Sequence, residues 1–141
     1  MGIWKTLIVG AGVLAGCSTL VIDSVEQLRE NNKKNIAQLA VGAPRAQVEK
    51  LLGDATAGGK LGDMVFGRLQ HFAVTNPQRV ESVTGPDGTA YDVLFYYTDL
   101  KVRDDKITDD ELTPIVLRDG KVVGIGYRFL GERVPKYRGY Q

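Results

Sequence analysis

The stretch Thr89–Thr98 constrains the fold of this chain more than any other part of the sequence. It contains neither glycine nor proline and is dominated by aromatic and branched side chains, which favour strands. Because successive side chains of a strand point to opposite faces, the stretch has two apolar faces. These faces are Tyr91-Val93-Phe95-Tyr97 and Leu94-Tyr96. A strand that is apolar on both faces is a central strand, and we expect helices to cover one of its sides.

A hairpin is predicted nearer the end of the chain, around Asp119-Gly120. This dipeptide is favoured in two-residue type I′ turns, where both positions need a positive φ. The strands on either side are predicted at Pro114–Arg118 and Lys121–Phe129. In the second strand the apolar residues Val123, Ile125, Tyr127 and Phe129 alternate with other residues. Gly124 and Gly126 would leave the opposite face nearly bare, so we expect a helix or another protein to approach it closely.

Two helices are predicted ahead of the sheet. Ser24–Leu39 begins with a serine that can cap it, and Gln27 completes the spacing of a capping box. The middle of this helix is polar, and we expect its asparagines to face solvent or a partner. These are Asn31, Asn32 and Asn35. A second helix lies between Pro44, which suits the first turn, and Gly53, which suits the C-terminal cap. The expected fold class is α+β, with two N-terminal helices packed on a small antiparallel sheet.

The segment between the helices and the central strand is harder to interpret. Asp54–Gly62 is rich in glycine and small residues and is predicted to be a flexible loop. Met64–Thr75 is either one strand or a short helix followed by a strand. Asn76-Pro77 predicts a break, and Arg79–Thr84 predicts a strand. Gly85–Gly88 then predicts the turn into the central strand.

The first residues divide like an export signal. Lys5 supplies the positive charge, and the apolar run Thr6–Leu14 is about half of the roughly 20 residues that cross a membrane. The next residues, Leu14-Ala15-Gly16-Cys17, contain the only cysteine and resemble the lipobox of bacterial lipoprotein signal peptides. That resemblance implies cleavage before Cys17, with lipid on its sulfur and on its new amino group. Two or more acyl chains anchor a protein stably in a membrane.

A competing motif overlaps this signal. Met1–Thr6 fits the N-myristoylation pattern, but that pattern explains neither the apolar run nor the place of Cys17. We therefore favour the lipoprotein interpretation. Ser18 follows the cysteine, where an aspartate would resemble an inner-membrane retention signal. The resemblance thus implies a protein anchored in the bacterial outer membrane and facing the periplasm.

Size and charge limit the remaining possibilities. Cleavage would leave 125 residues, which is enough for one domain with one core. The whole chain has 18 Lys and Arg against 17 Asp and Glu, and cleavage removes only Lys5. A balanced charge gives no support to nucleic-acid binding, which favours a basic excess. The expected organisation is a signal peptide at 1–16, a lipidated tether at 17–23, a domain at 24–130 and a tail at 131–141.

Two longer phrases resemble known families. The residues from Ile36 to Gly53 read I-x-x-L-x-x-G-x-P-x-x-Q-V-x-x-L-L-G, similar to the helical signature of the SmpA/OmlA (BamE-like) small outer-membrane lipoproteins. Pro44 and Ala55 depart from that signature. The F-Y-x-T strand at 95–98 and the T-P-x-V hairpin at 113–126 are similar to an uncharacterised family of small bacterial lipoproteins. The resemblances imply a BamE-like or β-lactamase-inhibitor-like arrangement of helices and sheet.

Little in the chain suggests catalysis, a metal or a cofactor. His71 is the only histidine, and no serine or cysteine motif accompanies it, so we expect no enzyme. The acidic run Asp104–Glu111 offers the carboxylates that a calcium site uses, but it lacks the EF-hand spacing and its central glycine. We favour a solvated loop. Gly53, Gly58, Gly59 and Gly62 lack the lysine-serine pair of a phosphate loop.

The tail and the functional expectation complete the sequence-based picture. The tail carries the basic and aromatic residues Arg133, Lys136, Tyr137, Arg138 and Tyr140. We expect it to be solvated or disordered in preference to forming a binding patch. For the whole chain we expect a lipid-anchored interaction or scaffold protein that supports outer-membrane protein assembly or envelope integrity, with an envelope protein as partner. The alternative is a periplasmic inhibitor or ligand-binding module.

Overall fold

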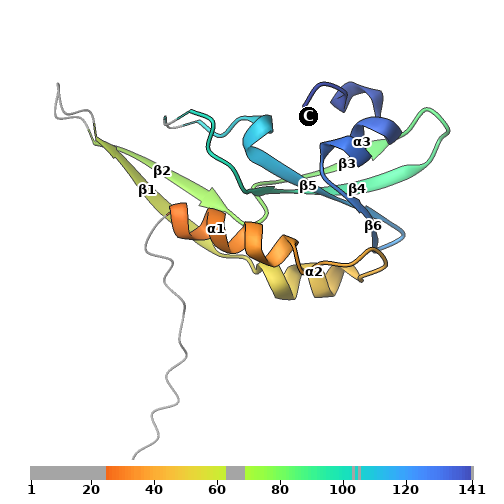
Figure 1. Cartoon of the computed structure of the whole chain (residues 1–141), viewed down its shortest axis with the longest axis horizontal. Helices are drawn as coiled ribbons and strands as arrows, with labels where there is room; N and C mark the ends of the chain where they lie inside the picture. The colour runs from red at the N-terminus through yellow and green to blue at the C-terminus, as the bar shows by residue number, and fades with distance from the viewer. Residues whose placement is uncertain (1–24, 63–68, 103, 105, 141) are drawn as a thin grey trace, which may run out of the picture.

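The computed structural model describes residues 25–62, 69–102, 104 and 106–140. Helices α1 and α2 come first and a set of antiparallel strands follows, so the predicted α+β class is confirmed (Figure 1). The helices are α1 (Val25–Ile36), α2 (Arg45–Leu52) and α3 (Tyr127–Arg133). The strands are β1 (Thr56–Gly62), β2 (Leu69–Thr75), β3 (Arg79–Thr84), β4 (Ala90–Tyr97), β5 (Leu112–Arg118) and β6 (Lys121–Ile125). Among the described residues, 3₁₀ turns occupy Asp109–Glu111 and Pro135–Tyr137.

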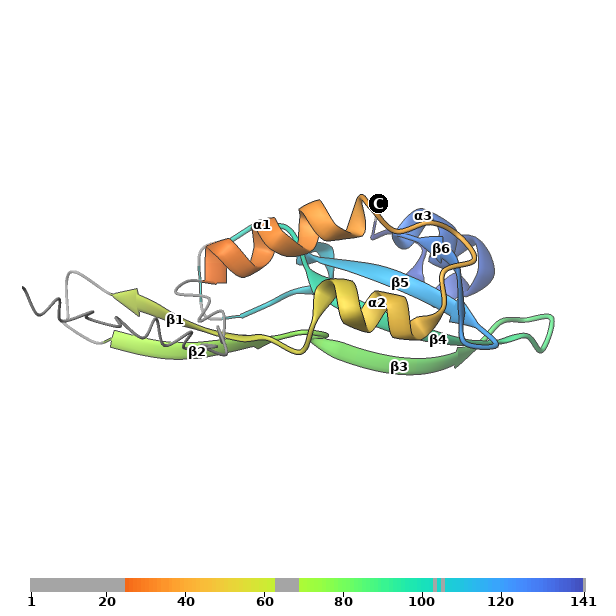
Figure 2. The ribbon, with the colours of Figure 1, turned by 90° about the horizontal axis from the view of Figure 1, so that it is seen from below.

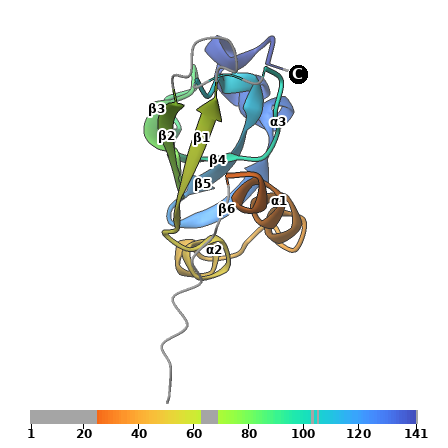
Figure 3. The ribbon, with the colours of Figure 1, turned by 90° about the vertical axis from the view of Figure 1, so that its left-hand side faces the viewer.

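The main sheet has four antiparallel strands in the order β3-β4-β5-β6. The predicted central strand is β4, and its two apolar faces belong to two different cores. Leu94 and Tyr96 pack with Val48 and Leu52 of α2, whereas Phe95 packs with the C-terminal segment. Figure 1 shows α2 and α3 on opposite sides of the sheet, and Figure 3 shows α1 beside α2. Burying both faces of β4 gives this small domain two apolar layers instead of one.

Helix α1 contributes to both cores. Val25 and Leu28 near its start pack with the Phe95 core, and Ile36 at its end packs with the Leu94 core. The prediction that its asparagines face solvent or a partner is wrong for Asn32, which is buried. Helix α2 lies where it was predicted, and the positive φ of Gly53 at its C-terminal cap explains the glycine there.

Most of the predicted loop at 54–62 is instead strand β1, which begins at Thr56. It pairs with β2 over its whole length, from Thr56 opposite Thr75 to Gly62 opposite Leu69. The glycines leave this segment without the alternation of apolar and polar side chains that indicates a strand. Its extended conformation depends instead on pairing with β2. The two strands form a hairpin that extends beyond the rest of the domain, and β2 runs nearly in line with β3 (Figure 2).

The hairpin around Asp119-Gly120 is confirmed, with φ values of 51° and 74° at the two residues. The expected continuation of its second strand to Phe129 is wrong, because β6 ends at Ile125 and α3 begins at Tyr127. Gly126, with φ of 89°, turns the chain between them. The bare face of Gly124 is occupied by the chain itself: a Cβ built on Gly124 would lie 2.2 Å from Cγ of Phe129.

The expectation of a solvated or disordered tail is also wrong. Val134 and Tyr137 are buried in the Phe95 core, and the Tyr137 ring lies 6.0 Å from the Phe95 ring. Burying a large aromatic ring contributes more than about 1 kcal/mol to the stability of the packed segment, whereas an exposed contact contributes only a few tenths of a kcal/mol. The packed domain therefore includes residues after 130, and the C-terminal segment supplies the second layer over the sheet.

Candidate binding cleft

The lipobox residues Leu14, Ala15, Gly16 and Cys17 and the tether lie outside the described residues, so lipidation stays a prediction. Among the helices that the structure describes, none combines the length and the apolar composition of a membrane-spanning segment. His71 lies in β2 and pairs with Lys60 across the hairpin. No set of three or more His, Cys, Asp or Glu side chains among the described residues is arranged to hold a metal ion.

The acidic run is organised around one buried carboxylate, that of Glu111, which is 1% exposed. Its Oε1 accepts hydrogen bonds from the backbone N–H groups of Lys101 and Val102 at 2.8 and 3.2 Å. Its Oε2 accepts one from the N–H of Thr108 at 3.1 Å, which completes a capping box on the 3₁₀ turn. Three donors compensate the cost of burying this charge.

The backbone of Glu111 also places the chain that follows β4. Its carbonyl oxygen accepts hydrogen bonds from the N–H groups of Thr98 and Asp99, both at 3.0 Å. Glu111 thus joins the end of β4, the loop after it and the start of β5 through both its main chain and its side chain. The predicted solvated loop is therefore tied to the sheet at this residue.

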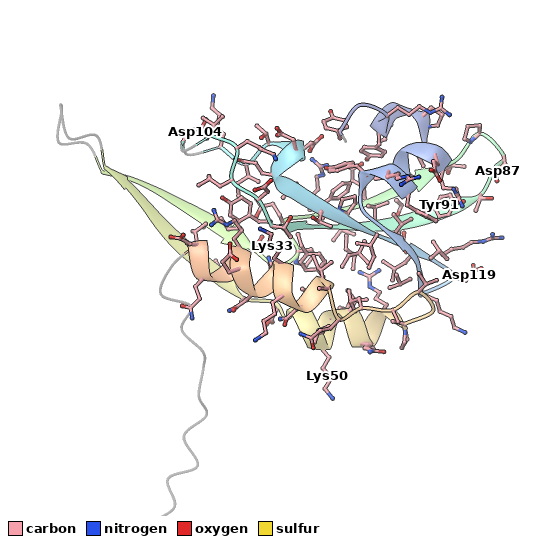
Figure 4. The ribbon with its side chains drawn as sticks, viewed as in Figure 1. Lys33, Lys50, Asp87, Tyr91, Asp104 and Asp119 are labelled. Carbon is pink, nitrogen blue, oxygen red and sulfur yellow. The ribbon has the colours of Figure 1, made fainter. Side chains whose placement is uncertain are left out.

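Beside Glu111 the structure has an open cleft of about 260 Å³. Its floor is formed by the buried side chains of Ile36 of α1, Leu112 of β5 and Thr98 after β4, with the half-buried Thr113 of β5 beside them. Its rim carries the charged side chains of Lys33, Asp99 and Asp110. In Figure 4, Lys33 lies between α1 and the segment that carries Asp104, whereas Lys50 of α2 points away from the sheet.

Two threonine hydroxyls meet in this cleft. Thr98 Oγ1 and Thr113 Oγ1 lie 2.6 Å apart and share a hydrogen bond across the ends of β4 and β5. Thr98 closes the F-Y-x-T phrase and Thr113 opens the T-P-x-V phrase. The two phrases were therefore the available sequence signal for this site, although neither threonine was singled out. No sequence motif marked Lys33, Asp99 or Asp110 as cleft residues.

Asp99 is held in its charged state by neighbours. The ammonium of Lys101 lies 2.6 Å from its Oδ2, and the N–H of Leu100 donates to its Oδ1 at 2.9 Å. These hydrogen bonds lower the pKa of Asp99, and the nearby charge of Lys33 acts in the same direction. Asp110 accepts a hydrogen bond from Thr108 Oγ1 at 2.5 Å. Both carboxylates at the rim are therefore placed by short-range contacts with the loop.

A second polar cluster lies over the other face of the sheet, under the C-terminal segment. Glu81 of β3 accepts hydrogen bonds from the hydroxyl of Tyr137 and the ammonium of Lys136. Arg79 Nε lies 2.8 Å from Glu81 Oε1, a charge contact without hydrogen-bond alignment, and its Nη1 donates to Asp109 at 2.8 Å. Each charge has an opposite charge beside it, so we interpret this cluster as the attachment of the C-terminal segment.

Comparison with known proteins adds one finding. Residues 72–130 match the model of a family described only as a protein of unknown function, DUF3192. The match covers less than half of the chain; it begins in β2 and ends in α3. It includes Thr98, Asp99, Asp110 and Thr113 of the cleft but not Lys33. No curated protein and no solved structure matches the chain significantly.

Proposed function

We propose that this chain is a lipid-anchored interaction protein of the bacterial cell envelope, attached to the outer membrane through Cys17 and facing the periplasm. The observation that carries the proposal is the single cysteine placed directly after Leu14-Ala15-Gly16, behind a short apolar run that follows a lysine. The chemistry of lipidation needs a sulfur nucleophile at that position, and the small residues before it fit the requirement for cleavage.

The role we propose is contact, as a scaffold or adaptor, and not catalysis. Three buried polar side chains in the described part of the chain serve the fold: Asn32 pairs with Asn76, and Glu111 accepts backbone hydrogen bonds. The similarity of the Ile36–Gly53 phrase to BamE-like lipoproteins supports a partner among envelope proteins. Support of outer-membrane protein assembly or of envelope integrity is the process that this similarity favours.

The short tether would hold the domain close to the membrane surface. Only residues 17–24 separate the proposed lipid from the start of α1 at Val25. A fully extended chain spans at most about 3.5 Å per residue, so α1 would begin within about 28 Å of the lipid surface. A partner that lies at the same surface is therefore within reach of the domain. Lengthening the tether with flexible residues should weaken any function that depends on this proximity.

The decisive experiment measures lipid attachment to the protein and its membrane location in the same cells. Cells expressing the chain are fed an alkyne fatty acid, and the membranes are separated by density. We expect label and outer-membrane recovery for the natural chain and for Ser18→Ala, and loss of both for Cys17→Ala. A Cys17→Ala protein that is still labelled and anchored overturns the proposal.

The partner is found by crosslinking the anchored chain in intact envelopes. A reproducible barrel-assembly or cell-wall protein, lost in Cys17→Ala, supports the scaffold role. Recovery of only a soluble periplasmic enzyme, inhibited by the purified chain, overturns that role in favour of an inhibitor module.

A further inference from the structure

The cleft lies at the start of β5, where the edge of this strand that faces β6 has no partner strand among the described residues. Strand β5 starts at Leu112, but the last residue of β6 that pairs with it is Ile125, opposite Ile115. The N–H of Gly126 still donates to the carbonyl of Pro114 at 2.8 Å, and there the chain turns away into α3. Leu112 and Thr113 therefore extend past β6 and line the cleft. An extended segment of another chain can enter beside them.

The lining of the cleft suits a long side chain with a polar end. Ile36 and Leu112 are buried at the floor and offer apolar surface, and the threonine hydroxyls lie beside them. A volume of about 260 Å³ is below the usual range for drug-sized or cofactor ligands, roughly 300–1,000 Å³. It is large enough for one side chain. Lysine and arginine combine an apolar stem with a charged head, which matches such a mixed lining.

The charge around the cleft selects a cation. Two rim carboxylates, those of Asp99 and Asp110, face one rim ammonium, that of Lys33. Lys101 neutralises Asp99 at 2.6 Å, but Asp110 is exposed, and its contact is with a hydroxyl. A cationic head at the rim would therefore form an ion pair with Asp110, which no described side chain of the protein forms.

We propose that the cleft bounded by Lys33, Asp99 and Asp110 binds a lysine or arginine side chain from an extended segment of a partner protein. The stem packs on Ile36 and Leu112, and the head reaches Asp110. The threonine pair provides further hydrogen-bonding capacity beside the head. The inference rests on the proposed interaction role for its partner, but its chemistry is independent of Cys17 and of the membrane.

The test uses the full chain in detergent and three blocked peptides, acetyl-Ser-Val-Xaa-Val-Ser-amide, in which Xaa is lysine, norleucine or glutamate. Amide shifts of Thr98, Asp99 and Thr113 are followed by NMR up to about 10 mM peptide, which detects millimolar affinity. We expect saturable shifts with the lysine peptide that weaken as salt rises, and at least about fivefold weaker binding of norleucine. No shift with the lysine peptide, or equal shifts with all three peptides, overturns the proposal.

Variants of the rim give effects of opposite sign. Asp110→Asn should weaken the lysine peptide about fivefold, and Asp110→Lys should abolish it and admit the glutamate peptide. Lys33→Ala should tighten the lysine peptide a few-fold, because it removes a competing cation. Asp119→Asn is the matched control: this residue lies at the opposite end of the domain (Figure 4), and asparagine tolerates its positive φ. An unchanged affinity in both Asp110 variants overturns the proposal.

These readouts separate the two proposals. Loss of lipid from Cys17→Ala would leave peptide binding in solution unchanged, whereas Asp110→Asn would leave the lipid label on Cys17. Unchanged amide spectra away from the cleft show that the rim variants are folded.

Discussion

Asn32 and Asn76 exchange two side-chain amide hydrogen bonds, 2.9 and 2.6 Å long, although 44 positions separate them in the sequence. Each amide nitrogen also donates to a main-chain carbonyl. Asn32 donates to Tyr97 at the end of β4, and Asn76 donates to Leu52 at the end of α2. The pair therefore joins α1, α2, the end of β4 and the base of the β1–β2 hairpin at one buried point.

Asn32→Ala should destabilise the domain strongly. It removes the donor to the Tyr97 carbonyl and leaves the buried amide of Asn76 without its reciprocal partner. Buried polar groups left unsatisfied cost about 1–3 kcal/mol each, so we expect a loss of about 2–4 kcal/mol in the free energy of unfolding. Urea denaturation followed by circular dichroism measures it. Asn31→Ala, at the exposed neighbouring position, should change stability by less than about 0.5 kcal/mol.

Glu111→Gln tests how the cleft is held in place. Glutamine presents an NH₂ group to one of the backbone N–H donors that the carboxylate now satisfies, and it removes the charge from three hydrogen bonds. We expect a loss of about 2–3 kcal/mol in unfolding free energy. Amide exchange at Lys101, Val102 and Thr108 should accelerate as well. Asp110→Asn, one position earlier but exposed, should do neither; similar losses in both variants would contradict the central role of Glu111.

The Glu81–Tyr137 contact predicts a dependence of stability on pH. Burial opposes the charged form of Glu81, but hydrogen bonds from Tyr137 and Lys136, with the charge of Arg79, outweigh it and lower the pKa of this carboxyl. A lowered folded-state pKa means that Glu81 stabilises the fold above its unfolded pKa of about 4.3. This stabilisation is lost as the pH falls through the folded-state value.

Tyr137→Phe removes the hydroxyl donor and should raise the pKa of Glu81 toward its ordinary value. We expect about 1 kcal/mol less stability at neutral pH and a smaller further loss on acidification, measured by urea denaturation between about pH 3 and pH 7. NMR titration of the Glu81 carboxyl carbon reports the pKa directly. Tyr140→Phe, in the same aromatic cluster, is the control. An unchanged Glu81 titration in Tyr137→Phe would refute the assignment.

The parts of the fold that could be predicted from sequence are those in which one segment carries its own pattern. The alternation in β4 predicted both of its buried faces, and Asp119-Gly120 predicted its turn because both residues need a positive φ. Strand β1 has no such pattern, since its pairing with β2 determines its conformation. The cleft could not be predicted for the same reason: Lys33 and Asp110 line one cleft only because α1 packs beside the end of the sheet.

The C-terminal layer shows how one glycine decides between two patterns. Tyr127 and Phe129 fit a strand with a period of two residues, whereas Tyr127 and Leu130 fit a helix, and the turn at Gly126 selects the helix. Phe129 then folds back onto Gly124, where any side chain would collide with it. The absence of a side chain at Gly124 is therefore a requirement of α3, and not an opening for another protein.

Gly124→Ala should consequently destabilise the domain through this contact. A Cβ at 2.2 Å from Phe129 Cγ forces the ring or α3 to move, and overpacking of this kind costs about 1–3 kcal/mol. Phe129→Ala alone should also destabilise, because it removes the ring from over β6 and from its contact with Arg133. The double variant should lose less than the sum of the two, since the alanine at 124 then meets no ring. Thermal unfolding of the four proteins measures the coupling, and strictly additive losses would show that the close approach of Phe129 to Gly124 does not govern the packing of α3.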